Sequence, residues 1–200
     1  MKRFVGAAAA IVLLAPFAAV PVHAQSADPR IAEALMPLPE DLKKDATVVA
    51  YDKTTGARQV LRQGSNQIEC QPKADDGFVR CYNKVLAPRR DLEAKLHAEK
   101  KSDKEVQEAI GAAQKAGTIK TPPFGTMSYR YTDDPSRIKL LWVMSVPNAT
   151  PETIGVSTVS QRDAALKGQG MPWLMLPGTP GAHVMIPINA RDISNTSDKK

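Results

Sequence analysis

Apolar and polar residues alternate along several short stretches of the chain, which is the pattern of β-strands with one buried face. The clearest stretch is Ile138–Val146, where every second residue is apolar. This regularity predicts a strand in the middle of a sheet. Alternation and β-branched composition predict seven more strands: Ala46–Asp52, Ala57–Arg62, Ile68–Cys70, Phe78–Asn83, Thr126–Tyr131, Met171–Leu176 and His183–Ile188. We expect the first four of the strands to form an antiparallel meander.

The apolar spacing changes to a helical one between the two groups of strands. Residues Pro88–Gly117 are charged, rich in alanine and free of internal proline. Ser102 followed by Glu105 is a capping box, which predicts a second helix beginning after Lys101 and ending at Gly117. One long helix is the alternative, with the charged residues 97–103 facing water. Short helical turns are also expected in Pro29–Met36, Leu38–Leu42, Pro151–Thr153 and Arg162–Gly168.

The apolar stripes of the two longer helices are narrow, so we expect both helices to lie on one face of the sheet. The predicted fold class is therefore α+β: a mainly antiparallel sheet of six to eight strands with an inserted helical pair on one face.

The first 24 residues have the composition of a signal peptide. Lys2 and Arg3 precede the apolar run Phe4–Val20, and Val22-His23-Ala24 fits the small residues before a cleavage site. We predict a signal peptide at 1–24, a single globular domain at 25–193 and a disordered polar tail at 194–200. A membrane anchor is the alternative for the leader. The expected location is periplasmic or secreted.

The two cysteines support this location. Cys70 and Cys81 flank a turn signal at Asp75–Gly77, so the pair predicts a disulfide across a β-hairpin, as is common outside the cytosol. A loop of this length contributes about 3 kcal/mol in the chain-entropy model. The spacing is too long for the C-x-x-C pattern of redox enzymes.

Charge and hydropathy narrow the range of partners. The leader holds two of the 27 basic residues and none of the 21 acidic ones, which leaves a net charge of +4. This mild, interspersed charge is not typical of a nucleic-acid-binding protein. No second apolar run is long enough to cross a bilayer, so we expect no transmembrane segment in the mature chain. The partner could be a small molecule or a component of the cell envelope.

Catalytic signatures are missing from the sequence. It contains no HExxH, GxSxG, C-x-x-C or phosphate-loop motif. Only His97 and His183 follow the leader, so one chain cannot supply three histidines to a metal. We expect no metal site and no cofactor.

His183 leaves two interpretations open. It follows the loop Pro177–Gly181, whose prolines and glycines could hold it as a general base or a ligand hydrogen-bond partner. Ser65 and Asn66, in another glycine-bearing turn, could meet it in space. Alternatively, His183 donates a ring hydrogen bond to a nearby carbonyl and fixes the loop.

Large apolar residues suggest a second type of site. Trp142, Trp173 and Met185 could line a pocket for an apolar ligand, since methionine suits adaptable binding surfaces. At strand spacing, the same residues are also typical of a core.

Several segments together resemble an uncharacterised family of exported bacterial proteins. They are Leu61–Cys70 (LRQGSNQIEC), the second cysteine Cys81, Gly125–Tyr131 (GTMSYRY) and Pro172–Ile188 (PWLMLPGTPGAHVMIPI). The resemblance implies export but no chemistry, because no activity is known for that family.

These observations favour an exported, non-enzymatic module that binds a small apolar or amphipathic ligand or an envelope partner. Two alternatives are a hydrolase-like enzyme that uses His183 and a structural envelope component. A binding module requires an apolar cavity beside Trp142 or Trp173. An enzyme requires a nucleophile or carboxylate within about 3 Å of His183, and a structural component requires a large flat apolar patch.

Overall fold

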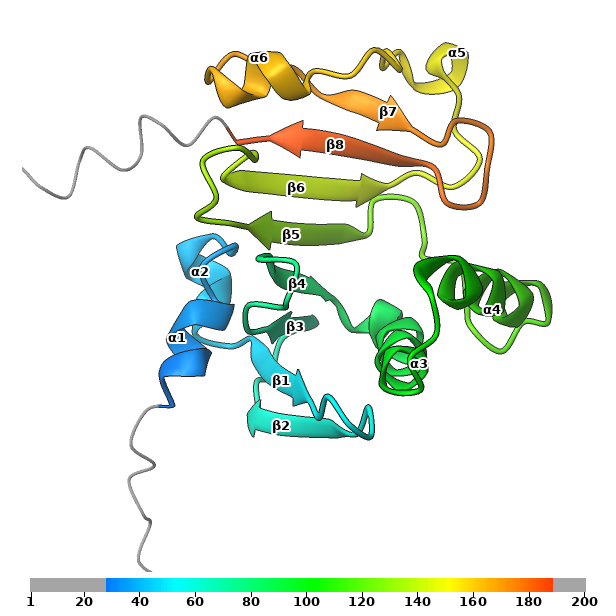
Figure 1. Cartoon of the computed structure of the whole chain (residues 1–200). Coiled ribbons are helices and arrows are strands. Elements are labelled where there is room, and N and C mark those ends of the chain that lie inside the picture. The colour runs from blue at the N-terminus through cyan, green and yellow to red at the C-terminus, as the bar shows by residue number, and fades with distance from the viewer. Residues whose placement is uncertain (1–27, 189–200) are drawn as a thin grey trace, which may run out of the picture.

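The computed structural model describes residues 28–188, which form an α+β fold around one sheet (Figure 1). The sheet has eight strands in the order β2-β1-β3-β4-β5-β6-β8-β7, and all but one of the neighbouring pairs are antiparallel. The predicted fold class is confirmed. The strands are β1 Thr47–Tyr51, β2 Arg58–Arg62, β3 Ile68–Gln71, β4 Val79–Asn83, β5 Met127–Tyr131, β6 Leu140–Ser145, β7 Trp173–Met175 and β8 His183–Pro187. The predicted signal peptide and polar tail lie outside the described residues.

The first strands do not form the predicted meander. Strand β1 pairs with β2 on one side and runs parallel to β3 on the other, with Val48 opposite Cys70. The prediction was wrong because alternation fixes which face a side chain takes but not which strand lies beside it. The β2–β3 connection therefore carries the chain back across β1, and β2 becomes an edge strand.

The two predicted longer helices are separate, as the capping box indicated. Helix α3 spans Ala87–Ala98 and α4 spans Asp103–Lys115. The Ser102 side chain accepts a hydrogen bond from the backbone N–H of Glu105, and the Glu105 carboxylate accepts one from the Ser102 N–H. A tight 3-10 turn, Lys84–Leu86, leads into α3. The remaining helices are short: α1 Pro29–Ala34, α2 Glu40–Lys43, α5 Pro151–Ile154 and α6 Arg162–Leu166.

At β1–β4 both faces of the sheet are covered, one face by α3 and the other by α1 and α2. Helix α3 lies against one face, where Asp91 bonds to Tyr51 and Arg90 stacks on the Tyr82 ring. We call this the α3 face. Helix α4 packs against α3 instead of lying on the sheet, so only α3 of the predicted pair covers it (Figure 1). Helices α1 and α2 lie on the opposite face, which we call the α1 face.

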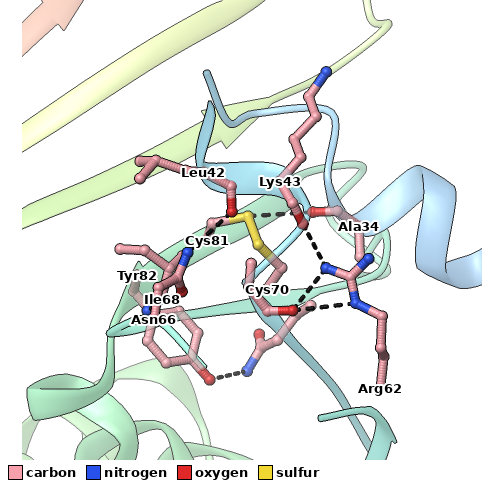
Figure 2. The surroundings of a disulfide bond; sticks show 11 residues. Ala34, Leu42, Lys43, Arg62, Asn66, Ile68, Cys70, Cys81 and Tyr82 are labelled. Carbon is pink, nitrogen blue, oxygen red and sulfur yellow. Dashed lines mark hydrogen bonds between the residues drawn. A yellow bond between two sulfur atoms is a disulfide. The ribbon is translucent and has the colours of Figure 1, made fainter. Parts of the chain in front are cut away.

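The disulfide lies in the core of the α1 face. Cys70 and Cys81 are directly opposite each other on β3 and β4, with Cα atoms 4.0 Å apart. The predicted disulfide across a hairpin is confirmed. Both residues are buried, and Cys81 Sγ lies 3.2 Å from the carbonyl oxygen of Ala34 in α1 (Figure 2). Buried apolar residues surround the pair: Ala34, Leu38, Ala46, Val48, Ile68 and Tyr129.

The strand predicted to be central, β6, lies inside the sheet between β5 and β8 and is one strand removed from the middle pair. Its side chains pack on both faces. Trp142 meets the ring of Tyr129 edge-on at 5.5 Å on the α1 face. Leu141 and Val143 join a small cluster with Trp173 and Met185 on the α3 face. The α3 face therefore remains apolar beyond the end of α3.

Candidate functional site

A cavity of about 590 Å³ opens on the α3 face of β5, β6, β8 and β7, beyond the area that α3 covers. This volume falls within the range of about 300–1,000 Å³ that is usual for small-molecule sites. The lining residues come from four strands and from the loops around them: Phe78, Arg130, Arg137, Ile138, Leu141, Thr158, Ser160, Arg162, Trp173, Leu174, Met175, Leu176, Pro177 and Met185.

The floor of the cavity is apolar because neighbouring strands place matching residues on one face. Antiparallel register sets Arg130 opposite Leu141, and Met185 opposite Trp173. Directly opposed residues share a face of the sheet. Leu141, Met185 and Trp173 are at most 9% exposed and pack together, so they form a fixed surface.

The mouth of the cavity exposes apolar side chains to solvent. Met175 and Leu176, at the end of β7, are 39% and 55% exposed. Thr158, Ser160 and Arg162 form the wall, on the segment between α5 and α6 and at the start of α6. An apolar floor with an exposed apolar mouth is typical of a ligand site.

Three arginines are the charged residues of the lining: Arg130, Arg137 and Arg162. Within residues 28–188, the lining contains no aspartate or glutamate. Arg137 forms an ion pair of 3.2 Å with Asp134, and Arg162 donates a hydrogen bond to the carbonyl oxygen of Ser136. Of the three, only Arg137 has a carboxylate partner in the described part of the chain.

Arg130 is the least compensated of these arginines. Its side chain projects from β5, an interior strand, and is partly buried. No described residue forms a hydrogen bond or ion pair with its guanidinium group. Burial, with the neighbouring positive charges of Arg80 and Arg90, lowers the pKa of Arg130 to about 10. The group remains charged at neutral pH but is destabilised.

The Phe78 ring fixes one side of the cavity. The guanidinium carbons of Arg80 and Arg137 lie 5.1 Å and 4.8 Å from its centroid. Both distances are within the range of cation–π interactions. Asp76 forms an ion pair with Arg80, and its carbonyl oxygen accepts a hydrogen bond from Arg137. These contacts hold Arg80 and Arg137, whereas the Arg130 guanidinium group has no such contact within residues 28–188.

Of the three large apolar residues predicted to bind a ligand, two lie in this cavity and one does not. Trp173 and Met185 form part of the floor. Trp142 projects to the other face, where it packs against the core around the disulfide. Strand alternation explains the difference, since Trp142 and the floor residue Leu141 are adjacent on β6.

Ser65 and Asn66 lie in the turn between β2 and β3 and are not among the residues that line the cavity; Figure 2 shows Asn66 beside the disulfide. The Asn66 side chain donates to the carbonyl oxygen of Leu42 at 3.0 Å and accepts from the backbone N–H of Ile68. Nearby, Arg62 donates to the carbonyl oxygens of Lys43 and Ala46. The turn therefore holds the chain that follows α2 against the sheet. It is not brought together with His183.

Gly64 explains the close approach in this turn. A Cβ atom at this position would lie 2.3 Å from the carbonyl oxygen of Asp45, so no other residue fits without a backbone shift. The segment Leu61–Cys70, which carries part of the family resemblance, therefore has a structural role. It holds the residues at the end of α2 against the sheet and contains Cys70 of the disulfide.

His183 begins β8, with its Nδ1 atom 2.8 Å from the carbonyl oxygen of Gly181. This geometry matches the interpretation in which the ring fixes the preceding loop. Within residues 28–188, the ring has no bonding contact with a nucleophile or a carboxylate. His97, in the last turn of α3, is remote from it in the fold.

Sequence reasoning missed the arginines of the cavity and Phe78. Arg130 lies in the predicted strand Thr126–Tyr131, between Tyr129 and Tyr131, and alternation alone gave it no role in a site. The signal that could have identified it is a charged residue on the second face of an interior strand whose neighbour on one side, β6, places the apolar residues Leu141 and Val143 on that face. Arg137, Arg162 and Phe78 lie in or beside loops, whose approach to the sheet has no period in the sequence.

The described residues contain no group of three or more histidine, cysteine, aspartate or glutamate side chains placed to bind a metal. Among the helices of residues 28–188, none combines the length and the apolar character that a membrane span requires. No protein-family model, no curated protein and no solved structure matches the chain.

Proposed function

We propose that the protein is an exported, non-enzymatic binding module that takes a small amphipathic molecule into the cavity on the α3 face. The observation that carries this proposal is a packed apolar floor beside an exposed apolar mouth, in a cavity of about 590 Å³. Burial of this surface by an apolar chain supplies a favourable free energy of roughly 25 cal/mol for each Å² removed from water.

The surroundings of His183 favour a binding module over a hydrolase-like enzyme. General base catalysis requires a partner within about 2.6–3.2 Å of the imidazole. Here a backbone carbonyl occupies that position at one ring nitrogen. The floor of the cavity supplies only apolar groups and an indole, and in its wall the Ser160 hydroxyl accepts a hydrogen bond from the backbone N–H of Arg162 and not from an imidazole.

The disulfide supports the exported location. Such bonds persist mainly in oxidising compartments, which include the bacterial periplasm and the extracellular space. A buried disulfide and a leader-like N-terminus are consistent with a protein that acts in the cell envelope. A ligand carrier or sensor in that compartment fits both features.

Ligand binding can be tested through Trp173. The sequence holds two tryptophans, so Trp142→Phe leaves Trp173 as the only one. The Trp142 Nε1 atom is buried without a hydrogen-bond partner, so phenylalanine loses no hydrogen bond there. We expect dodecanoate, added below its micelle concentration, to change Trp173 emission with saturation.

Two further variants control this measurement. Thr158→Phe narrows the cavity from its exposed wall and should weaken binding at least tenfold. Val60→Phe adds the same ring at an exposed position on β2 and should leave binding unchanged. Equal effects of the two variants, or no saturable change with dodecanoate or with dodecanol, would contradict the proposal.

A further inference from the structure

We propose that the amphipathic ligand carries an anionic head group, carboxylate or phosphate, and that Arg130 binds it. This inference rests on the proposed function, because it names the chemical class of the molecule that the cavity takes. It also identifies the end of the cavity at which the head group lies.

The first support is the charge of the lining. Arg130, Arg137 and Arg162 line the cavity, no aspartate or glutamate is among its described lining residues, and of the three only Arg137 forms an ion pair, with Asp134. A partly buried positive charge is unfavourable unless it is paired. A ligand anion supplies the missing partner. A neutral ligand would leave the Arg130 guanidinium group without an ion-pair partner among the described residues, and a cationic ligand would add to the repulsion from Arg80 and Arg90.

The second support is the contrast with neighbouring arginines on the same face. Arg58 pairs with Glu69 and Asp91, and Arg80 pairs with Asp76. Arg90 pairs with Glu93. Each of these side chains has a carboxylate partner within the protein. Arg130, on the strand next to β4, has none among the described residues and is the one that lines the cavity.

The third support is the direction of the cavity across the sheet. From Arg130 on β5, the floor passes through Leu141 on β6 and Met185 on β8 to Trp173 on β7. Neighbouring strands are about 4.8 Å apart, so these three steps span about 14 Å. A ligand with its charge at Arg130 would lay its apolar chain over this floor. The exposed side chains of Met175 and Leu176 mark the other end.

The guanidinium group suits this role because its planar fork can donate two hydrogen bonds to one carboxylate or phosphate. Arg162 is held through a backbone carbonyl oxygen and not by a carboxylate of the described residues, so its positive charge in the cavity wall also favours an anionic ligand. Arg130 is a binding residue in this proposal, and no covalent step is involved.

The test compares head groups on a constant chain. Dodecanoate, dodecyl phosphate, dodecanol and dodecyltrimethylammonium are titrated below their micelle concentrations, with Trp173 emission in the Trp142→Phe protein as the readout. We expect both anions to bind at least tenfold more tightly than dodecanol, and the cation to bind most weakly. Whichever of the two anions binds more tightly shows whether the head group of the ligand is a carboxylate or a phosphate. Acetate and inorganic phosphate should produce no change, since they lack the chain.

Substitution at Arg130 gives an independent result. Arg130→Met should lower affinity for the preferred anion at least tenfold and leave dodecanol affinity within twofold. Arg130→Lys should recover part of the loss. Arg30→Met removes one positive charge from an exposed position in α1 and should change nothing.

The outcomes separate the two proposals. Equal binding of dodecanol and both anions would overturn the anionic head group and leave the binding function intact. Tightest binding of the cation, or an unchanged anion affinity in Arg130→Met, would also overturn it. If none of the four amphiphiles binds, the proposed function fails together with the inference. The comparison of head groups needs no substitution at Arg130, so it still tests the inference if an Arg130 variant fails to fold.

Discussion

The two halves of the α3 face differ in whether their partly buried arginines are paired with carboxylates. Over β1–β4, helix α3 covers the sheet, and the buried Glu69 forms an ion pair with Arg58. Over β5–β8, no described helix covers the face, and Arg130 lies in the lining of a cavity without a carboxylate partner. The first half uses its charged groups to attach a helix. The second half leaves a charge unsatisfied beside an apolar floor.

The direction of the pKa shift of each arginine distinguishes a polar cluster that stabilises the fold from one that is available to bind a ligand. In the covered half, burial alone would lower the pKa of Arg58, but the hydrogen bonds and charges of its partners, Glu69 first and then Asp91, together outweigh it and raise the pKa. In the open half, burial and neighbouring cations lower the pKa of Arg130. A charge that the fold stabilises contributes to folding, whereas a charge that the fold destabilises is available to an external partner.

The largest effect is expected from breaking the pair in the covered half. Arg58→Met leaves the Glu69 carboxylate buried and without a partner, since its second oxygen is already unbonded among the described residues. Removal of one member of a buried pair costs about 3–5 kcal/mol. Urea denaturation should show a loss of this size. A loss below about 1 kcal/mol would show that the pair does not stabilise the covered half.

The second effect concerns the disulfide beneath the same strands. Cys70→Ala with Cys81→Ala removes the cross-link, and the free energy of unfolding should fall by about 3 kcal/mol. The cavity lies on the other face and on other strands, so dodecanoate affinity of the folded protein should stay within twofold. A large loss of affinity in folded protein would show that the two halves are coupled.

The third effect has the opposite sign. Arg130→Met replaces an unpaired, partly buried charge with an apolar side chain of similar length. Such replacements are neutral or stabilising, so the ligand-free protein should gain up to about 1 kcal/mol while it loses affinity for the anion. Thermal unfolding without ligand measures this. Destabilisation by more than about 1 kcal/mol would indicate that Arg130 supports the fold.

The smallest effect is a pH dependence in the covered half. Burial alone would raise the pKa of Glu93 in α3, but Arg90 and Arg89 outweigh it and lower the pKa from its ordinary value of 4.5. The Glu93 contribution is therefore present above pH 4.5 and is lost as the pH falls through the lowered pKa. We expect about 0.5 kcal/mol, measured as the difference between the parent and Glu93→Gln at pH 7 and at pH 3. An unchanged difference would contradict this assignment.

The fold was largely predictable because its elements depend on local patterns. The Ser102–Glu105 capping box separated α3 from α4, and the turn at Asp75–Gly77 placed the two cysteines opposite each other. The parallel β1–β3 pair was not predictable, since side-chain alternation is the same for either neighbour. The docking of α1 and α2 on the face opposite α3 depends on contacts of α1 with β4 and of α2 with Arg62 and Asn66, which have no local signal in the sequence.

The candidate site was predictable only in its apolar part. Trp173 and Met185 were identified because large apolar residues in strands must pack on something. Arg130 was missed because an arginine in an alternating strand normally faces water. Arg130 lines a cavity because α3 does not extend over β5. The extent of sheet that a helix covers depends on tertiary packing and cannot be predicted from a local pattern. Asn66 was considered as a possible partner of His183. Its hydrogen bonds to the Leu42 carbonyl oxygen and from the Ile68 N–H, which give it a structural role, cannot be inferred from the sequence of its turn.

The two tryptophans test the central claim directly, since their indole groups lie on opposite faces of the sheet. Two-dimensional ¹H–¹⁵N spectra should resolve one indole signal for each, and Trp142→Phe assigns them. Titration with dodecanoate and with dodecyl phosphate should shift the Trp173 signal with saturation and leave that of Trp142 in place. A shift of the Trp142 signal alone, or of neither signal, would show that the open half of the α3 face is not a ligand site.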